Sequence, residues 1–583
     1  MKAETGPSRT LPEPSFRPAL AHPERIMNPS LPAPVDGLTI GAVLRATAAR
    51  RQAAEAVVFP QLSLRWSWTR FAEEVERAAR GLLALGIRPG EHVALWATNV
   101  PEWVVLQFAT ARIGAVLVTI NPAYRPHELQ YVLKQSDAVA LFLVDRFKSS
   151  DYHAMLQEVC PELGRCAAGE LQAERFPKLR TIVTLKGSAL PGALAWPQLL
   201  ARAESVDPQQ IEEIAATLRC DQPINVQYTS GTTGFPKAAT LSHRNLLNNA
   251  YYIGACQGFT AADRLCIPVP FYHCFGCVLG TLSTVVFGSA MIIPAESFNA
   301  ADTLSAIESE RATAVYGVPT MFIAMLQDPS FAGRDLTSLR TGIMSGSPCP
   351  IEIMRRVIDE MGAREMTIAY GQTEASPVVT QTRADDPIEL RVETVGRPLP
   401  GWEVKIVDPA TGVELGDSEP GEFCCRGHGV MLGYYHDPAA TAKAIDPAGW
   451  LHTGDIAVRL PTGYFKITGR IKDMVIRGGE NIYPREIEEF LFTHPAIEQA
   501  AVVGVPDPKY VEELCAWVKL KPGARLTCEE VQAYCRAKLA HFKIPRYVKF
   551  VEAFPQTVTG KIQKFKIRDL MRAELGLEEH RTA

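Results

Sequence analysis

In the first third of the chain, short alternating apolar runs are followed by helical spacings. Residues 62–67 alternate apolar and polar positions, which predicts a strand with its apolar side chains on one face. The next apolar residues recur every three or four positions up to Gly86, which predicts a helix with a glycine stop. The apolar positions are Leu62, Leu64 and Trp66 in the strand, and Phe71, Val75, Ala78 and Leu82 in the helix.

This alternation of strand and helix continues along the chain. Residues 92–97 and 115–120 are strand-like, and a helix is predicted between them at about 101–112. The same pattern recurs around residues 290–294, 312–316 and 341–345. Strands that alternate with helices over short connections predict an α/β fold, with parallel sheets covered by helices.

Beyond about Gly469 the pattern changes. A helix at 485–492, strands at 499–505, 515–520 and 546–551, and a helix opened by Thr527 with Glu530 as a capping box predict a small α+β unit. We therefore expect a proline-rich tail at 1–35, a large α/β domain at 36–469, and a smaller, mobile α+β domain at 470–583. The 470–472 segment is the expected junction.

Composition narrows the function classes. The chain has 583 residues, and 60 basic against 64 acidic residues give a net charge of −4, which argues against nucleic acid as a partner. The 13 cysteines show no framework, which indicates free thiols in a reducing compartment. The N-terminal segment mixes acids with bases and has no apolar core, so we predict no targeting signal and a cytoplasmic location.

One stretch imitates a membrane span. No charged residue lies between Arg264 and Glu296, but prolines and glycines interrupt the run. Buried elements around a pocket explain it better than a spanning helix. Peripheral membrane contact stays open, as does the choice between monomer and homodimer.

A loop rich in glycine and hydroxyl groups is the clearest chemical signal. It runs from Tyr228 to Lys237 with the sequence YTSGTTGFPK, after an apolar stretch. Glycines let backbone N–H groups approach phosphate oxygens, hydroxyls add donors, and the lysine adds positive charge. It is not a Walker A loop, because Pro236 precedes the lysine and Ala238 follows it. The alternative is a surface turn. The predicted phosphate-binding residues are Thr229, Ser230, Gly231, Thr232, Thr233, Gly234 and Lys237.

The loop resembles the phosphate loop of the acyl-adenylate-forming superfamily, which includes acyl-CoA synthetases, luciferases and peptide-synthetase adenylation domains. Later motifs extend the resemblance over roughly residues 40 to 575. The segments SGSPCP at 345–350 and YGQTE at 370–374 are most similar to medium- and long-chain fatty-acid–CoA ligases. The resemblance implies a large α/β domain with a small mobile lid, and ATP, Mg²⁺ and coenzyme A as the molecules used.

The resemblance assigns residues to the nucleotide. Thr373 would bind the α-phosphate and Glu374 would hold Mg²⁺, a hard cation that seeks carboxylate and phosphate oxygens. Asp455, in the segment GWLHTGD at 449–455, would accept hydrogen bonds from the ribose hydroxyls, and Arg470 would contact ribose or phosphate. Without the other motifs, Glu374 could be a helix N-terminal acid and the Thr-Gly-Asp segment an ordinary turn. The residues assigned to adenine are Gly346, Ser347, Pro348, Tyr370 and Gly371.

By the same resemblance, the C-terminal part supplies the moving groups. Lys561, in PQTVTGK at 555–561, matches the catalytic lysine that reaches the carboxylate and the α-phosphate. Lys472 would be the hinge, and Gly478 and Gly479 would line the tunnel for the pantetheine arm of CoA. In isolation, a lysine near a C-terminus is usually a solvated charge.

The acyl site is assigned to the uncharged stretch. Tyr272 and His273 resemble the aromatic segment that forms a wall of the acyl pocket, and the absence of an acid there favours a simple carboxylic acid over an amino acid. Cys274 and Cys277 form a Cys-x-x-Cys beside His273, but without a second pair we expect no metal there. Cys424 and Cys425 are expected to pack in a strand.

These observations predict an ATP-dependent ligase that forms acyl-AMP from a fatty or similarly apolar acid and passes the acyl group to CoA. Two alternatives remain. The adenylate could go to a carrier protein's phosphopantetheine arm, or be oxidised as in luciferases. The chain could instead be a non-catalytic nucleotide- or acyl-binding protein, although such a protein would not need Lys237, Glu374, Asp455, Arg470 and Lys561 together.

Overall fold

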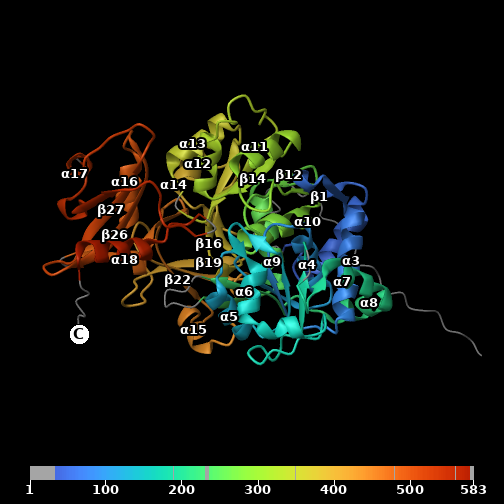
Figure 1. Cartoon of the computed structure of the whole chain (residues 1–583). Helices are drawn as coiled ribbons and strands as arrows, with labels where there is room; N and C mark the ends of the chain where they lie inside the picture. The colour runs from blue at the N-terminus through green and yellow to red at the C-terminus, as the bar shows by residue number, and fades with distance from the viewer. Residues whose placement is uncertain are drawn as a thin grey trace, which may run out of the picture.

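The computed structural model describes residues 33–187, 190–229, 236–347, 349–477, 480–536, 538–557 and 560–577. Figure 1 shows a large N-terminal domain and, to its left, a small C-terminal domain that carries the last helices. The large domain is built on two mixed sheets whose inner strands run parallel. This confirms the predicted α/β fold with a second, smaller α+β domain.

The first sheet has nine strands in the described residues, and its inner strands β1, β13, β12, β14, β15 and β16 are parallel. Antiparallel strands close both of its edges. In sheet order the strands are β18 (Arg397–Pro398), β17 (Val378–Gln381), β16 (Glu365–Gly371), β15 (Thr341–Ser345), β14 (Ala314–Gly317), β12 (Arg264–Cys266), β13 (Ala290–Ile292), β1 (Glu55–Phe59) and β2 (Leu64–Ser67).

The second sheet has eight strands within the ranges that the structure describes, again with a parallel centre. Strands β3 and β5 are buried along their whole length, as expected of parallel strands covered on both faces. In sheet order the strands are β21 (Gly433–Tyr434), β11 (Lys237–Ser242), β10 (Pro223–Thr229), β4 (Val116–Thr119), β3 (His92–Trp96), β5 (Ala138–Leu143), β8 (Thr181–Thr184) and β9 (Leu194–Ala195).

Helices cover these sheets. Helix α9 is buried on nearly every side, which is typical of a helix enclosed within a domain. The helices of the large domain are α2 (Ile40–Arg51), α3 (Trp68–Ala84), α4 (Pro101–Arg112), α5 (Pro126–Gln135), α6 (Tyr152–Val159), α7 (Trp196–Arg202), α8 (Pro208–Thr217), α9 (His243–Cys256), α10 (Ser283–Phe287), α11 (Ala300–Ser309), α12 (Pro319–Gln327), α13 (Ile351–Glu360), α14 (Ile388–Glu393) and α15 (Pro438–Ala444).

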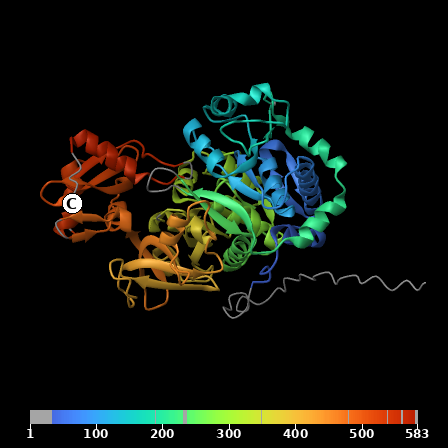
Figure 2. The ribbon, with the colours of Figure 1, turned by 90° about the horizontal axis from the view of Figure 1, so that it is seen from below.

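A four-stranded antiparallel sheet follows in the chain, and Figure 2 shows this yellow-to-orange region beside the small domain. Its strands in sheet order are β19 (Trp402–Val407), β20 (Gly421–Gly427), β22 (Leu451–Arg459) and β23 (Phe465–Arg470). The chain leaves β23 through a single 3-10 turn, Ile471–Asp473, and enters the sheet of the small domain. The limits proposed for the domains, at 35 and 469, remain predictions.

The small domain is one sheet with an apolar cluster on each face. Its helix α17 begins with the predicted capping box: Glu530 N–H donates to Thr527 Oγ1 (3.2 Å), and Thr527 N–H donates to Glu530 Oε2 (2.8 Å). Helix α18 was not predicted. The elements are β24 (Val475–Arg477), β25 (Glu480–Ile482), β26 (Ile497–Asp507), β27 (Val511–Leu520), β28 (Tyr547–Phe550), α16 (Pro484–Phe492), α17 (Cys528–Arg536) and α18 (Lys564–Leu575).

The prediction was wrong at the start of the first alternating run. Leu62 does not share the strand face of Leu64 and Trp66, because it ends a 3-10 turn and is 54% exposed. Ser63 has a φ of 50°, which breaks the extended backbone before β2 begins at Leu64. The predicted strand, residues 62–67, was therefore two positions longer than β2.

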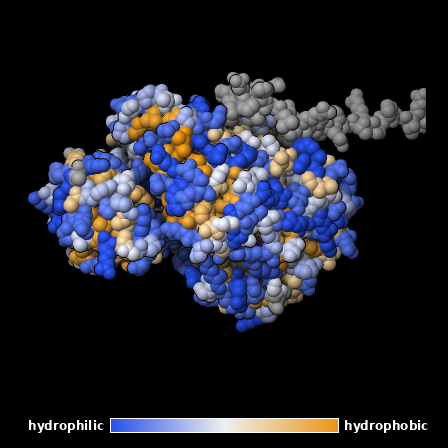
Figure 3. All heavy atoms as spheres, turned by 90° about the horizontal axis from the view of Figure 1, so that it is seen from above, coloured by the Kyte–Doolittle hydropathy of each residue, from blue (hydrophilic) through white to orange (hydrophobic). Residues whose placement is uncertain are grey.

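The uncharged stretch folds into short elements. It contains β12, a buried π-helix (Phe275–Leu282), α10 and β13. Across the part of the chain that the structure describes, no helix is long and apolar enough to span a bilayer. All 13 cysteines are free thiols. Seen from above, the surface is largely hydrophilic, with an apolar area on the large domain beside the small one (Figure 3).

Candidate active site

The two strands that carry the predicted phosphate loop meet at its base. Thr229 ends β10, Lys237 begins β11, and the two residues are paired in antiparallel register. The structure thus brings a hydroxyl and an ammonium group to the two ends of the loop. The remaining predicted loop residues, which lie outside the described ranges, are Ser230, Gly231, Thr232, Thr233 and Gly234.

Glu374 lies directly beside this base. It sits in the 3-10 turn Thr373–Ala375 after β16, and only 9% of it is exposed. Its Oε1 accepts hydrogen bonds from the Tyr434 hydroxyl (2.8 Å) and the Thr229 hydroxyl (3.3 Å). Among the described residues, both hydrogen bonds to this carboxylate fall on Oε1. A buried carboxylate next to a phosphate-binding loop has the oxygen chemistry that Mg²⁺ prefers, so the donor set fits this cation.

Tyr434 is a site residue that sequence reasoning missed. It lies on the short strand β21, which pairs with β11 through Ala239. Its ring lies 4.9 Å from Lys237 Nζ, within the range of a cation–π contact. Burial raises the pKa of the Tyr434 phenol, and the Glu374 carboxylate raises it further, so the hydroxyl stays a donor. Tyr434 and Glu374 are 60 positions apart, and no sequence spacing links them.

The residues predicted to hold ribose also converge. Asp455 on β22 is paired with Arg470 on β23, and only 3% of Asp455 is exposed. Its Oδ1 lies 2.6 Å from Arg470 Nε, and its Oδ2 accepts a hydrogen bond from the Tyr370 hydroxyl at 2.8 Å. The Asp455 charge raises the pKa of the Arg470 guanidinium. The carboxylate is thus fixed by two donors before any sugar hydroxyl approaches it.

The predicted adenine segment follows the carboxyl end of β15. Gly346 has a φ of 90°, a region that favours glycine. At the end of β16, a Cβ on Gly371 would lie 1.8 Å from the Pro377 carbonyl oxygen, so the turn requires glycine there. Ser347 lies beside Gly346, whereas Pro348 falls outside the described residues. Both turns lie at the carboxyl ends of neighbouring parallel strands, where α/β sheets bind ligands.

Lys561 reaches this site from the small domain. It precedes Ile562, which forms an isolated β-bridge with Gln556, and its backbone N–H donates to Thr557 Oγ1 at 3.0 Å. A Cβ added to Gly346 would lie 3.7 Å from Lys561 Cε. Burial lowers the pKa of the Lys561 ammonium, and the neighbouring Arg470 charge lowers it further. The lysine therefore lies beside the predicted adenine segment of the large domain.

The predicted hinge and tunnel residues lie next in the chain. Lys472 is in the 3-10 turn that joins the two domains, and burial lowers the pKa of its ammonium group. Gly478 and Gly479 lie outside the described residues. The hinge role and the tunnel role remain predictions.

The predicted acyl wall adjoins the nucleotide site. Tyr272 is buried, and His273 Nδ1 accepts a hydrogen bond from the Phe275 N–H at 3.2 Å. Burial lowers the pKa of His273 to about 3, so its ring is neutral and its proton is on Nε2. Cys274 Sγ lies 3.7 Å from the Thr373 hydroxyl, which joins this segment to the Glu374 turn.

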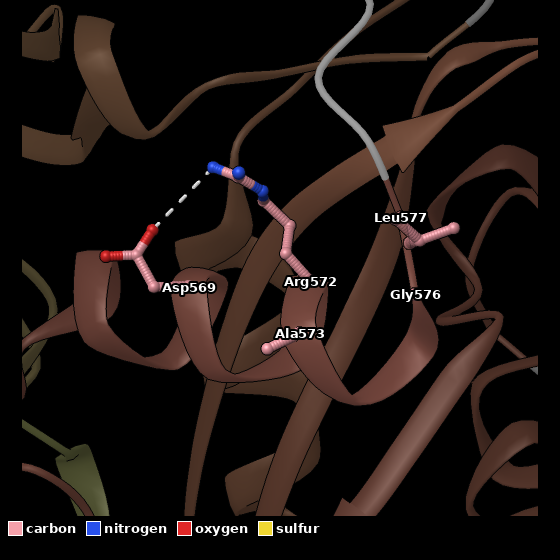
Figure 4. Close-up of a pocket in the computed structure, with 5 residues that line it drawn as sticks. All are labelled: Asp569, Arg572, Ala573, Gly576 and Leu577. Carbon is pink, nitrogen blue, oxygen red and sulfur yellow. Dashed lines mark ion pairs between the residues drawn. The ribbon is translucent and has the colours of Figure 1, made fainter.

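A surface hollow lies elsewhere, at the end of α18. Figure 4 shows its five lining residues, Asp569, Arg572, Ala573, Gly576 and Leu577. Its polar groups include the Asp569–Arg572 ion pair, at 3.9 Å within one helical turn. None of the predicted site residues lines this hollow.

Comparison with known proteins identifies the family of this chain. Residues 44–435 match the family model described as AMP-binding enzyme, and residues 486–561 match the AMP-binding enzyme C-terminal domain. The chain belongs to the AMP-binding enzyme family. It is 52% identical to the putative acyl-CoA synthetase YngI of Bacillus subtilis, over 91% of this chain and 96% of that protein. It is 45% identical to the mitochondrial medium-chain acyl-CoA ligase ACSF2 of Danio rerio, over 93% and 90%.

Solved structures show the same fold over nearly the whole chain. The anthranilate CoA ligase AuaEII, in complex with anthranoyl-AMP, superposes with a TM-score of 0.82 at 26% identity, covering 94% of this chain and 100% of that one. The Mycobacterium tuberculosis fatty acyl CoA synthetase superposes with a TM-score of 0.69 at 28% identity, covering 92% and 99%.

Proposed function

We propose that this chain is an ATP-dependent, AMP-forming acyl-CoA ligase that acts on a medium-chain, apolar carboxylic acid. The observation that carries the proposal is the meeting of Lys561 with the large-domain site at Gly346, beside the Asp455–Arg470 pair. The relatives named as acyl-CoA synthetase and medium-chain acyl-CoA ligase support both the reaction class and the chain length.

The first step joins the acid to AMP. An oxygen of the substrate carboxylate attacks the α-phosphorus of ATP, and the bond to the bridging oxygen breaks, so that pyrophosphate leaves. No general base is needed, because the nucleophile is already ionised at neutral pH. Lys561 and Lys237 place positive charge where negative charge develops on the phosphate oxygens.

Glu374 would hold Mg²⁺, with Thr229 and Tyr434 orienting its carboxylate. When bound, the cation supplies Lewis-acid stabilisation of phosphate oxygens. The protein's own part is to keep Glu374 buried and oriented. Asp455, already fixed by Tyr370 and Arg470, would position the ribose hydroxyls.

The second step transfers the acyl group. The thiolate of CoA attacks the acyl carbon, the C–S bond forms, and the bond to the phosphate oxygen breaks, so that AMP leaves. We infer that the small domain first rotates at Lys472 and withdraws Lys561, which frees one face of the adenylate for CoA. Such a motion is a hinge transition between two rigid parts.

The acyl site favours an uncharged chain. The stretch from Leu265 to Ala295 carries no acid that could hold an α-ammonium group, and His273 is neutral. The buried π-helix that follows His273 offers apolar side chains. These features support a fatty acid over an amino acid.

Pyrophosphate release across a series of acids from acetate to palmitate, with ATP and Mg²⁺ and with or without CoA, tests the proposal. We expect a CoA-stimulated rate that peaks at medium chain length. Release without stimulation by CoA would keep the adenylation step and refute CoA as the acceptor. Silence across the series would refute the proposed reaction.

A further inference from the structure

A group of potential metal ligands lies on the four-stranded sheet, apart from the Glu374 site. Cys424 on β20 is paired with His452 on β22, so their side chains share one face of the sheet. Glu422 precedes Cys424 by two positions, which puts it on the same face of the strand. Glu422 and Cys424 are buried, and His452 is partly exposed. The sheet thus gathers a carboxylate, a thiol and an imidazole.

Glu422 and Cys424 both contact the Nδ1 atom of His452. His452 Nδ1 lies 2.8 Å from Glu422 Oε2 and 3.4 Å from Cys424 Sγ. The three potential ligand atoms all lie within 4.8 Å of one another. Zinc bonds of about 2.0–2.3 Å in a tetrahedron place neighbouring ligand atoms about 3.3–3.6 Å apart. The His452–Cys424 distance already falls in this range, and the His452–Glu422 distance is about half an ångström short of it.

We propose that Glu422, Cys424 and His452 form a binding site for a thiophilic divalent cation of the Zn²⁺ type, distinct from the Mg²⁺ site proposed at Glu374. One carboxylate and one thiolate neutralise the two positive charges of the ion. On binding, Cys424 loses its thiol proton to solvent. His452 binds the ion through Nδ1 and carries its ring proton on Nε2. Three protein ligands leave the fourth position for water.

The surroundings support this ligand set. Asp446 Oδ2 lies 3.9 Å from His452 Nε2, and a carboxylate on the far side of a metal-bound imidazole fixes the ring and raises its basicity. Lys405 on β19 pairs with Cys424, and its ammonium group would repel a bound cation. Its Nζ lies 4.3 Å from the centre of the Trp450 ring, a cation–π contact that anchors the ammonium group.

The proposed metal site is connected to Asp455, the residue proposed to hold the ribose of ATP. Glu422 Oε1 accepts a hydrogen bond from the Gly454 N–H at 3.0 Å, and Gly454 directly precedes Asp455. A cation that draws Glu422 Oε2 away from His452 therefore acts on the part of β22 that carries Asp455. Occupancy of the site should raise the KM for ATP and leave the KM for the acid unchanged.

Zinc binding to the full-length enzyme, measured by equilibrium dialysis with Mg²⁺ in excess and no ATP, tests the site. The variants are Cys424→Ala and His452→Gln, and Cys425→Ala is the matched control. Cys425 is the neighbouring residue on β20, but its side chain packs in the core of the large domain on the opposite face. We expect the parent and Cys425→Ala to bind one Zn²⁺ that both site variants bind at least tenfold more weakly. Equal binding by all four proteins would overturn the proposal.

Cobalt(II) gives a second readout that does not depend on the variants folding alike. The parent and the control should show a cobalt–thiolate charge-transfer band that Cys424→Ala lacks; its absence from the parent would refute thiolate ligation. In the ATP assay, Zn²⁺ should raise the KM for ATP in the parent and not in Cys424→Ala. An identical response of both proteins would refute the coupling to Asp455.

Discussion

The two domains contribute to the active site in opposite ways. The large domain packs one continuous core, and its acids Glu374 and Asp455 are buried and each held by two donors. The small domain has two apolar clusters on the faces of one sheet, and it supplies Lys561 from the segment before α18. The acids proposed to bind the nucleotide are thus held by the folded large domain, whereas the lysine proposed to support adenylation belongs to a domain with apolar clusters of its own.

Removal of the lysine should separate the two half-reactions. Lys561→Ala should slow adenylation by about 10²–10³-fold, the usual loss when a preorganised donor is deleted from a transition state. Thioester formation from supplied acyl-AMP should stay within about threefold of the parent, because the lysine is withdrawn in that step. Pyrophosphate release and acyl-CoA formation from synthetic acyl-AMP measure the two steps. An equal loss in both would contradict the assigned role.

Loss of the Tyr434 hydroxyl tests whether its hydrogen bond to Glu374 supports Mg²⁺ binding. Tyr434→Phe removes the donor to Glu374 and keeps the ring beside Lys237, so the concentration of Mg²⁺ for half-maximal adenylation should rise about tenfold, as expected for a hydrogen bond to a charged group. Mg²⁺ titrations of parent and variant measure this change. The control is Tyr534→Phe, because the Tyr534 hydroxyl contacts Thr493 within the small domain. An unchanged Mg²⁺ requirement in Tyr434→Phe would show that Glu374 needs no such support.

The sequence predicted the features that depend on local interactions better than those that depend on contacts between residues far apart in the chain. The helix at Pro101–Arg112 and the strand at Thr341–Ser345 match their predicted limits, because local periodicity and flanking signals define them. The Asp455–Arg470 pair, whose members were predicted singly to contact the nucleotide, forms because the register of β22 and β23 sets them opposite each other. Tyr434 and Glu374 are brought together by the β21–β11 pairing, a tertiary event that leaves no mark on local spacing.

The roles of the site residues were predicted by resemblance, from residue types that recur in a fixed order along the chain, and these roles remain predictions. The structure adds what resemblance could not: which donors hold each acid, and that Lys561 lies at Gly346. Leu62 shows where residue types mislead. Their alternation predicted a strand from residue 62, but the positive φ of Ser63 delays the start of the strand to Leu64.

The pH dependence of adenylation should reveal the buried environment of the lysine. Because burial lowers the pKa of Lys561, raising the pH removes its proton earlier than from a free lysine, whose pKa is about 10.4. Adenylation should therefore be fully supported below the folded pKa and fall as pH rises through it. ATP–pyrophosphate exchange measures this step without CoA. Lys561→Arg keeps its charge, so any activity that it retains should lack this alkaline fall; an identical fall would assign the titration to another group.

The smallest expected effect concerns the independence of the two cores. Thr527→Ala removes the capping hydroxyl of α17 in the small domain and should cost about 1 kcal/mol of local stability. Ser67→Ala removes the equivalent cap of α3 in the large domain, where Ser67 Oγ accepts from the Arg70 N–H at 3.1 Å. Hydrogen exchange of the full chain should show faster opening of the small domain alone in the first variant, and of the large domain alone in the second. If either substitution speeds exchange in both domains, the two cores unfold together. Withdrawal of Lys561 would then destabilise the large-domain site as well.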